Sequence, residues 1–240
     1  MFNFLASERY RLSRQPALYI FLAVCIGILL LMGGLMRFWD GDLSDFGIAI
    51  ASLLTFGLYI FAAVFASSFS KDRSMILQLS AQGQSRMRIL FGQYLMSLLV
   101  ALLFAAVLLV TAVIIGFFLF DSPGPERVAF LKTLVREVAI TLALLIPLHA
   151  LAFSLQYLMN NIAMSVAVFF VLAFFLPAAF SLALGRQRVL DWFIQMSPYH
   201  QSLELYFNDT LRAGRAALSV FMNSAFWLII AAVKFRKCEL

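Results

Sequence analysis

The chain is a series of long apolar runs separated by short polar segments. Each run approaches the roughly 20 residues that an α-helix needs to cross about 30 Å of hydrocarbon. This pattern predicts an all-α integral membrane protein with six transmembrane helices. The predicted spans are approximately Ala17–Met36, Phe46–Ser68, Ile89–Phe120, Thr133–Leu158, Ile162–Leu184 and Ala213–Val233.

Composition narrows the class of protein further. Hydrophobic residues make up 63% of the 240 residues and charged residues only 12%. A soluble domain of this length cannot bury so much apolar surface, so lipid must be the solvent for most of the chain. We expect one transmembrane domain over residues 1–240. The two cysteines, Cys25 and Cys238, form neither a disulfide framework nor a metal-binding pattern.

The distribution of charge predicts the orientation in the membrane. Basic residues gather before the first span, between the second and third, and after the sixth, whereas most acidic residues lie in the other loops. By the positive-inside rule, both termini are then cytoplasmic. The net charge of +6 is better explained by this topology than by binding of nucleic acid. The basic residues of these three segments are Arg9, Arg11, Arg14, Lys71, Arg73, Arg86, Arg88, Lys234, Arg236 and Lys237.

The segment between the second and third spans, residues 70–88, predicts a short cytoplasmic hairpin. Ser70 is placed to cap a helix, and Gly83 to end it in a left-handed conformation. Ser85 then caps the helix that becomes the third span. An apolar stripe at helical spacing, Met75, Ile76 and Leu79, lies between the two caps. The alternative interpretation is a solvated basic loop.

Two further segments are amphipathic. Residues 1–15 alternate aromatic and basic side chains, which predicts an interfacial helix or an ordinary basic flank of the first span. Residues 186–212 predict two short re-entrant helices, which meet at Ser197-Pro198 and dip into the outer leaflet. A surface loop with aromatic anchors is the alternative for the second segment.

Few polar residues lie within the predicted spans. Such residues are costly in hydrocarbon and face protein or water. They line a transport pathway on one interpretation, and form hydrogen bonds between helices on the other. The candidates are His149, Gln156, Asn223 and Ser224.

Enzymatic functions are disfavoured by the motifs that are missing from the sequence. The chain contains no phosphate-binding Gly-x4-Gly-Lys-Ser/Thr loop and no His-Glu-x-x-His zinc motif. It has two histidines, His149 and His200, and no nucleophile elbow of the rhomboid kind. We therefore expect no catalytic residue, cofactor site or metal site in this chain.

The order of segments resembles a known family. The chain consists of an interfacial basic segment, two spans, an inner basic hairpin with the element Gly83-Gln-Ser-Arg86, and four more spans. This order resembles the permease subunit of type-2 ATP-binding-cassette exporters, including bacteriocin-immunity and drug-export relatives. In that family the hairpin docks on the ATPase, and a lysine is common where Gln93 or Tyr94 stands here. The resemblance assigns ATPase docking to Asp72, Arg73, Met75, Ile76, Leu79, Gly83, Ser85 and Arg86.

The resemblance implies a function. The chain would be a non-catalytic permease in a bacterial cytoplasmic membrane, paired with a second copy or a similar chain. Separate ATPase subunits would bind ATP and Mg, and the cargo would be an amphipathic peptide, a lipid-like compound or a drug. Three alternatives stay open: a secondary transporter driven by an ion gradient, an intramembrane enzyme, and a membrane sensor or scaffold that transports nothing.

Overall fold

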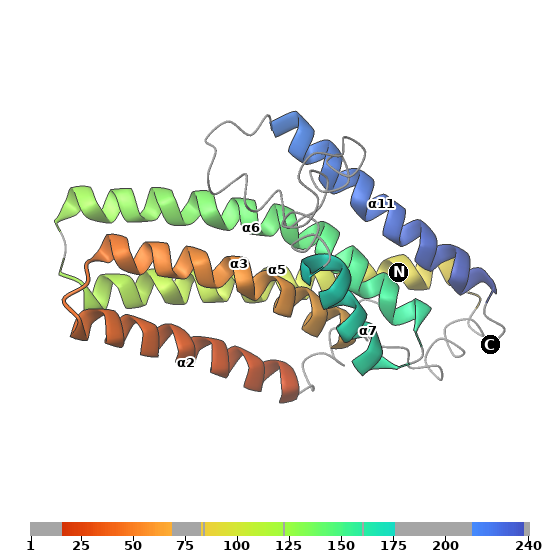
Figure 1. Cartoon of the computed structure of the whole chain (residues 1–240), viewed down its shortest axis with the longest axis horizontal. Coiled ribbons are helices and arrows are strands. Elements are labelled where there is room, and N and C mark those ends of the chain that lie inside the picture. Colours follow the sequence, from red (N-terminus) through yellow and green to blue (C-terminus); the bar gives the residue numbers. More distant parts are fainter. Residues whose placement is uncertain are drawn as a thin grey trace. The chain divides into compact units, whose positions relative to one another are not determined.

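The fold was obtained as a computed structural model that describes residues 16–68, 83, 85–121, 123–159, 161–175 and 213–237. Almost all of these residues are helical, and none of them forms a strand. Figure 1 shows the elements in chain order. They are α2 (Pro16–Phe38), α3 (Leu43–Ser68), α5 (Arg86–Leu119), α6 (Gly124–Leu158), α7 (Ile162–Phe170), the π-helix η1 (Val171–Phe175) and α11 (Ala213–Lys237).

Three of these helices are long and apolar enough to cross a membrane, as expected for an integral membrane protein: Pro16–Phe38, Met87–Leu119 and Gly124–Leu158. The second and sixth predicted spans coincide with the helices α3 and α11. Helix α6 begins at Gly124, well before the predicted Thr133. The fifth predicted span is described only as far as η1, and it contains a shorter apolar helix over Ile162–Ala173.

The chain divides into two compact units. Unit 1 contains residues 1–56 and 99–142, and unit 2 contains residues 57–98 and 143–240. Helices α3, α5 and α6 therefore contribute one half to each unit. The two units are described separately below.

In unit 1, α2 ends in a well-formed Schellman motif. The amide of Gly41 donates to the carbonyl of Met36 at 2.9 Å, and the amide of Asp40 donates to the carbonyl of Arg37 at 3.3 Å. Asp40 takes the left-handed position, with φ of 55°, which aspartate tolerates better than most residues. These bonds satisfy carbonyl groups that the helix end would otherwise leave without partners.

The next helix begins at once, through reciprocal caps. Asp42 Oδ1 accepts a hydrogen bond from the amide of Asp45 at 2.7 Å, and Asp45 Oδ2 accepts one from the amide of Asp42 at 3.4 Å. This is a capping box with aspartate in both positions. The two motifs together join α2 to α3 within residues 39–42.

The core of unit 1 is packed around Phe46 and Phe130. Their rings stack with centroids 6.5 Å apart, and Phe46 also stacks on Phe120 at 5.3 Å. Glycines allow this close approach, since a Cβ on Gly47 would lie 3.1 Å from Phe130 and one on Gly116 would lie 3.2 Å from it. Small residues at helix contacts are typical of membrane proteins.

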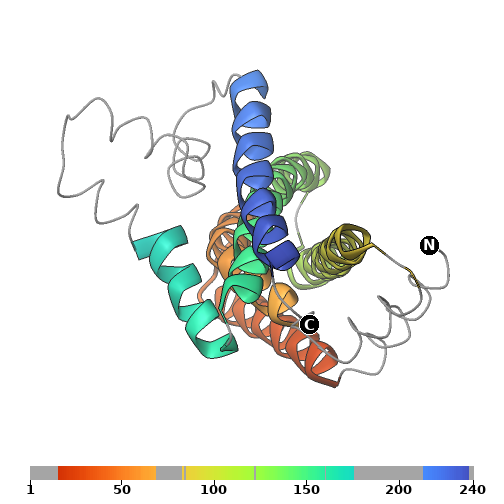
Figure 2. The same ribbon diagram turned by 90° about the vertical axis from the view of Figure 1, so that its right-hand side faces the viewer.

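Unit 2 is built on the second half of α6, where residues 147–157 are all buried. The helix continues through Pro147, although proline lacks the amide that would bond to the carbonyl four residues earlier. Asn161 caps the start of α7, and its side chain accepts hydrogen bonds from the amides of Ala163 and Met164 at 2.8 and 3.3 Å. Figure 2 shows α7 and α11 as separate helices of this unit.

The start of α5 has the local structure predicted for it. Gly83 has φ of 78°, the left-handed conformation that favours glycine. Ser85 Oγ accepts a hydrogen bond from the amide of Arg88 at 3.4 Å, and α5 begins at Arg86. The left-handed glycine and the serine cap are as predicted, whereas the predicted helix before Gly83 lies outside the described residues.

Candidate functional site

The predicted docking residues are only partly described. Gly83, Ser85 and the backbone of Arg86 form the junction just described. The predicted interfacial segment 1–15 and outer segment 186–212 lie outside the described residues. So do Asp72, Arg73, Met75, Ile76 and Leu79.

The other predicted set, the polar residues within the spans, falls in unit 2. His149 lies on α6 and is fully buried, with 0% of its surface exposed. Its Nε2 atom lies 2.6 Å from Oγ of Ser97 on α5, a buried residue as well. This hydrogen bond joins residues 52 positions apart, so it ties two helices together at a point where lipid and water are both excluded.

Aromatic rings surround this pair. The ring of His149 lies 5.6 Å from that of Tyr94 and 6.3 Å from that of Phe153, measured between centroids. Tyr94 and Phe153 meet edge to face at 5.6 Å. A neutral imidazole suits such surroundings, because a buried charge without a counter-charge is costly.

The Ser97 hydroxyl also lies 2.9 Å from the carbonyl of Tyr94. A serine carries one hydroxyl proton, so Ser97 donates either to that carbonyl or to Nε2 of His149, and the tautomer of His149 decides which. The Nδ1 atom of His149 is buried and forms no well-aligned hydrogen bond within the described residues, although the backbone of Ala62 on α3 lies beside the ring.

A second polar pair joins the same two helices. The Tyr157 hydroxyl on α6 donates a short hydrogen bond to Oε1 of Gln93 on α5, and both residues are buried. The ring of Tyr157 in turn packs edge to face against Phe235 of α11, with centroids 5.3 Å apart. We refer to Gln93, Tyr94, Ser97, His149 and Tyr157 as the buried polar cluster.

Helix α11 is attached to α6 by another hydroxyl. Ser154 Oγ lies 2.7 Å from the carbonyl of Ala150 on its own helix and 2.7 Å from the carbonyl of Trp227 on α11. A backbone carbonyl inside a helix offers a second lone pair, so α11 accepts this bond without losing its own helical bonds.

The other predicted pathway residues share no hydrogen bond with His149 in the part of the chain that the structure describes. Gln156 is buried on α6, and Ser224 donates to the carbonyl of Val220 on its own helix at 2.7 Å. Asn223 is half-buried on α11. That the four residues line a transport pathway stays a prediction.

Sequence reasoning did not select Ser97, Tyr157 or Ser154. One signal was present: Gln93 and Ser97 are four residues apart, as are His149, Phe153 and Tyr157. Residues at this spacing share one face of a helix. Two polar faces of this kind, on separate apolar helices, can pair with each other when buried.

The chemistry of the cluster is that of neutral donors and acceptors. It contains an imidazole, two phenols, a hydroxyl and an amide, with no carboxylate or ammonium group. No group of three or more metal-ligating side chains occurs among the described residues. No protein-family model and no curated protein matches this chain. The case for a function therefore rests on its own residues.

Proposed function

We propose that this chain is the permease subunit of an ATP-driven exporter similar to type-2 ATP-binding-cassette permeases. In this proposal it has six spans and cytoplasmic termini, and it works with a second permease chain and separate ATPase subunits. ATP and Mg bind to those ATPases. The cargo is an amphipathic peptide, a lipid-like compound or a drug.

The observation that carries the proposal is the junction at the start of α5. Gly83 is left-handed, Ser85 caps the next helix, and α5 then runs unbroken for 34 residues. A helix of that length extends about 51 Å, more than the roughly 30 Å of hydrocarbon. A force applied to the basic hairpin would therefore pass into a rigid helix that crosses the whole bilayer.

The buried polar cluster gives that helix a partner to move with. Ser97 and Gln93 on α5 are bonded to His149 and Tyr157 on α6. Movement at the cytoplasmic end of α5 is thereby transmitted to α6 instead of being lost by slippage. Alternating access then follows from nucleotide contacts that favour one of two arrangements.

The experiment is capture of an ATPase. The chain is co-expressed in turn with each P-loop ATPase whose gene adjoins its own in the source genome. Co-purification is compared between wild type and the Met75→Asp/Leu79→Asp variant. Aspartates in a partly apolar contact carry a large desolvation cost, so we expect capture to collapse while membrane insertion is retained. Val128→Asp, at an exposed position near the start of α6, is the control and should capture normally.

Two results would reject the proposal. One is equal capture by wild type and the double variant with unchanged transport. The other is robust ATP hydrolysis by the purified chain alone, because no phosphate-binding loop is present in its sequence.

A secondary transporter remains the second candidate, supported by the buried histidine. An ionisable residue within membrane-crossing helices is a common mark of proton relays, and Nδ1 of His149 is buried without a well-aligned hydrogen bond among the described residues. Uptake or efflux driven by a proton gradient in liposomes without ATP would favour this candidate. If the chain neither captured an ATPase nor transported a solute, the sensor or scaffold that transports nothing would be the favoured function.

A further inference from the structure

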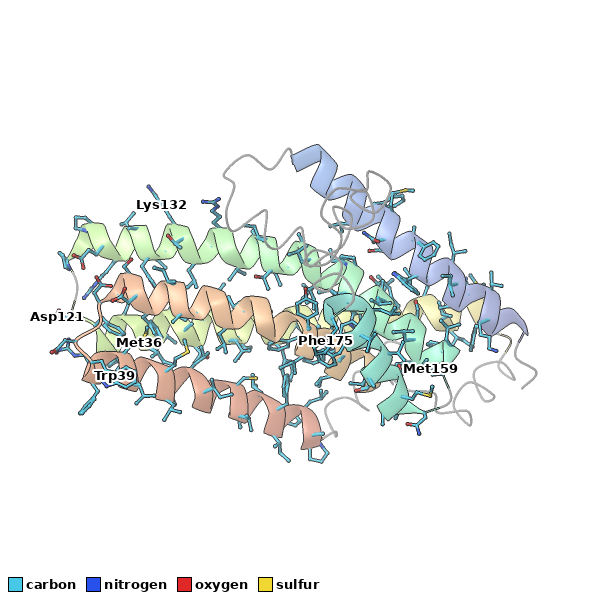
Figure 3. The ribbon with its side chains drawn as sticks, viewed as in Figure 1. Met36, Trp39, Asp121, Lys132, Met159 and Phe175 are labelled. Carbon is cyan, nitrogen blue, oxygen red and sulfur yellow. The ribbon has the colours of Figure 1, made fainter. Side chains whose placement is uncertain are left out.

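The connection between α2 and α3 contains a surface pocket that the proposed function does not use. Its volume is about 360 Å³. Figure 3 labels Met36 and Trp39, which lie at this end of α2. The lining residues are Met36, Trp39, Gly41, Asp45, Ile48 and Ala49.

The walls of this pocket combine an aromatic ring with a carboxylate. Trp39 is 73% exposed, so its indole is open to a ligand. Asp45 uses Oδ2 for a long bond of 3.4 Å within the capping box, and its Oδ1 has no partner among the described residues. Among aromatic rings, tryptophan binds an ammonium ion most strongly over its face, and a carboxylate forms charge-assisted hydrogen bonds with an ammonium ion.

The surrounding charge also favours a cation. Asp40 and Asp42 lie in the same connection, and Arg37 is the one basic residue between Met36 and Ala49. Neither Arg37 nor Asp40 forms a side-chain ion pair within the part of the chain that the structure describes. The pocket therefore has an excess of negative charge, with one exposed guanidinium available to an anionic group on the same ligand.

The position of the pocket identifies the source of the ligand. It begins where α2 ends, and α2 is one of the helices long and apolar enough to cross a membrane. The exposed ring of Trp39, at 73%, is typical of residues at the boundary between hydrocarbon and water. Lipid headgroups occupy that depth.

We propose that this pocket binds the headgroup of a zwitterionic phospholipid, with the ammonium group between Trp39 and Asp45. The phosphate of the same lipid faces Arg37, and the acyl chains follow the apolar surface of α2. The pocket is rigid because the Schellman motif and the capping box hold both of its helix ends. Binding of this kind is independent of the exporter assignment.

The first test measures which lipids stay bound. The full chain is reconstituted with equal amounts of phosphatidylethanolamine and phosphatidylglycerol, purified in mild detergent, and weighed intact by mass spectrometry. We expect wild type to retain phosphatidylethanolamine preferentially. Trp39→Leu and Asp45→Asn should each lower that retention about two- to fivefold, the range expected for one exposed cation contact. Asparagine keeps an oxygen for the capping box, so Asp45→Asn should remain folded.

Matched controls separate this site from general charge effects. Asp121→Asn removes an exposed carboxylate outside the pocket and should leave retention unchanged. Trp39→Phe keeps an aromatic face and should restore most of the binding lost in Trp39→Leu. Equal retention of phosphatidylethanolamine by wild type, Trp39→Leu and Asp45→Asn would overturn the proposal.

A second measurement does not require the lipid to survive detergent. In a Trp192→Phe/Trp227→Phe background, Trp39 is the only tryptophan, and its fluorescence is recorded in bilayers that contain a spin-labelled phosphatidylcholine headgroup. Quenching above that of randomly mixed lipid, lost in Asp45→Asn, supports the site. Quenching at the random level overturns it. Equally strong binding of soluble glycerophosphoethanolamine would show a site for free solutes and reject the lipid assignment.

Discussion

Nε2 of His149 lies 2.6 Å from Oγ of Ser97, and both atoms are buried. Interior hydrogen bonds between membrane helices contribute modestly, because the separated helices find other partners. We expect a double-mutant cycle with Ser97→Ala and His149→Ala to give a coupling of about 0.6–1.7 kcal/mol in the free energy of unfolding. Thr111→Ala, whose hydroxyl bonds only to its own helix, should show no coupling with His149→Ala. A coupling of zero at Ser97 would contradict the bond.

The Tyr157–Gln93 pair predicts a contrast between two tyrosines. Tyr157→Phe leaves Oε1 of Gln93 buried without its donor, and an orphaned buried acceptor costs about 1–3 kcal/mol. Tyr94→Phe should cost clearly less, because the Tyr94 hydroxyl is 3.4 Å from the carbonyl of Ile146. Adding Gln93→Leu to Tyr157→Phe should recover part of the loss, and SDS-titrated unfolding measures all three. Equal losses for the two tyrosines would refute the assignment.

Adjacent glycines on α2 should respond in opposite directions. A Cβ on Gly33 would lie 2.9 Å from Leu119 Cδ1 and 3.0 Å from Ile115 Cγ2, whereas one on Gly34 meets nothing within 4 Å. Leu119 Cδ1 ends a flexible side chain and can turn aside, whereas Ile115 is stiff because it branches at Cβ. Gly33→Ala should therefore destabilise unit 1 by about 1 kcal/mol, the low end of the cost of overpacking. Gly34→Ala should be neutral or stabilise by up to about 1 kcal/mol through helix propensity. Thermal unfolding in matched detergent compares them, and a destabilising Gly34→Ala would count against this packing.

The left-handed Gly83 predicts a graded response to substitution. Its φ of 78° costs an alanine about 1–2 kcal/mol, while asparagine enters this region more readily. We expect Gly83→Ala to reduce capture of the ATPase more than Gly83→Asn does, since only alanine favours a helix running straight through the break. If Gly83→Asn reduced ATPase capture more than Gly83→Ala, the left-handed conformation of Gly83 would not be what the hairpin needs for docking.

Topology is testable at the two ends of α5. Ser85 and Asp121 flank a helix of 34 residues, about 51 Å long, and both residues are exposed. In a Cys25→Ser/Cys238→Ser background, S85C should react with an impermeant maleimide only after cells are permeabilised. D121C should react in intact cells. Labelling of both from outside would break the six-span arrangement with cytoplasmic termini.

Features encoded within a few residues were predictable from the sequence. The apolar runs placed the described helices, and Gly83 and Ser85 marked the left-handed residue and the cap before α5. Such signals act locally, because a cap needs only the amide groups of the next turn. The start of α6 was missed, since the polar residues between Gly124 and Thr133 interrupt hydrophobicity without interrupting the helix.

The sequence by itself determined that the chain is helical and apolar enough for a membrane, and which polar residues would be costly to bury there. Only the tertiary structure decided their partners. Ser97 and His149 are 52 residues apart, and Gln93 and Tyr157 are 64 apart, so no local pattern connects them. Nor could spacing reveal that Phe130 packs against Gly47 and Gly116. A buried polar group must find some partner, but which one it finds depends on how the helices rotate to pack their apolar faces.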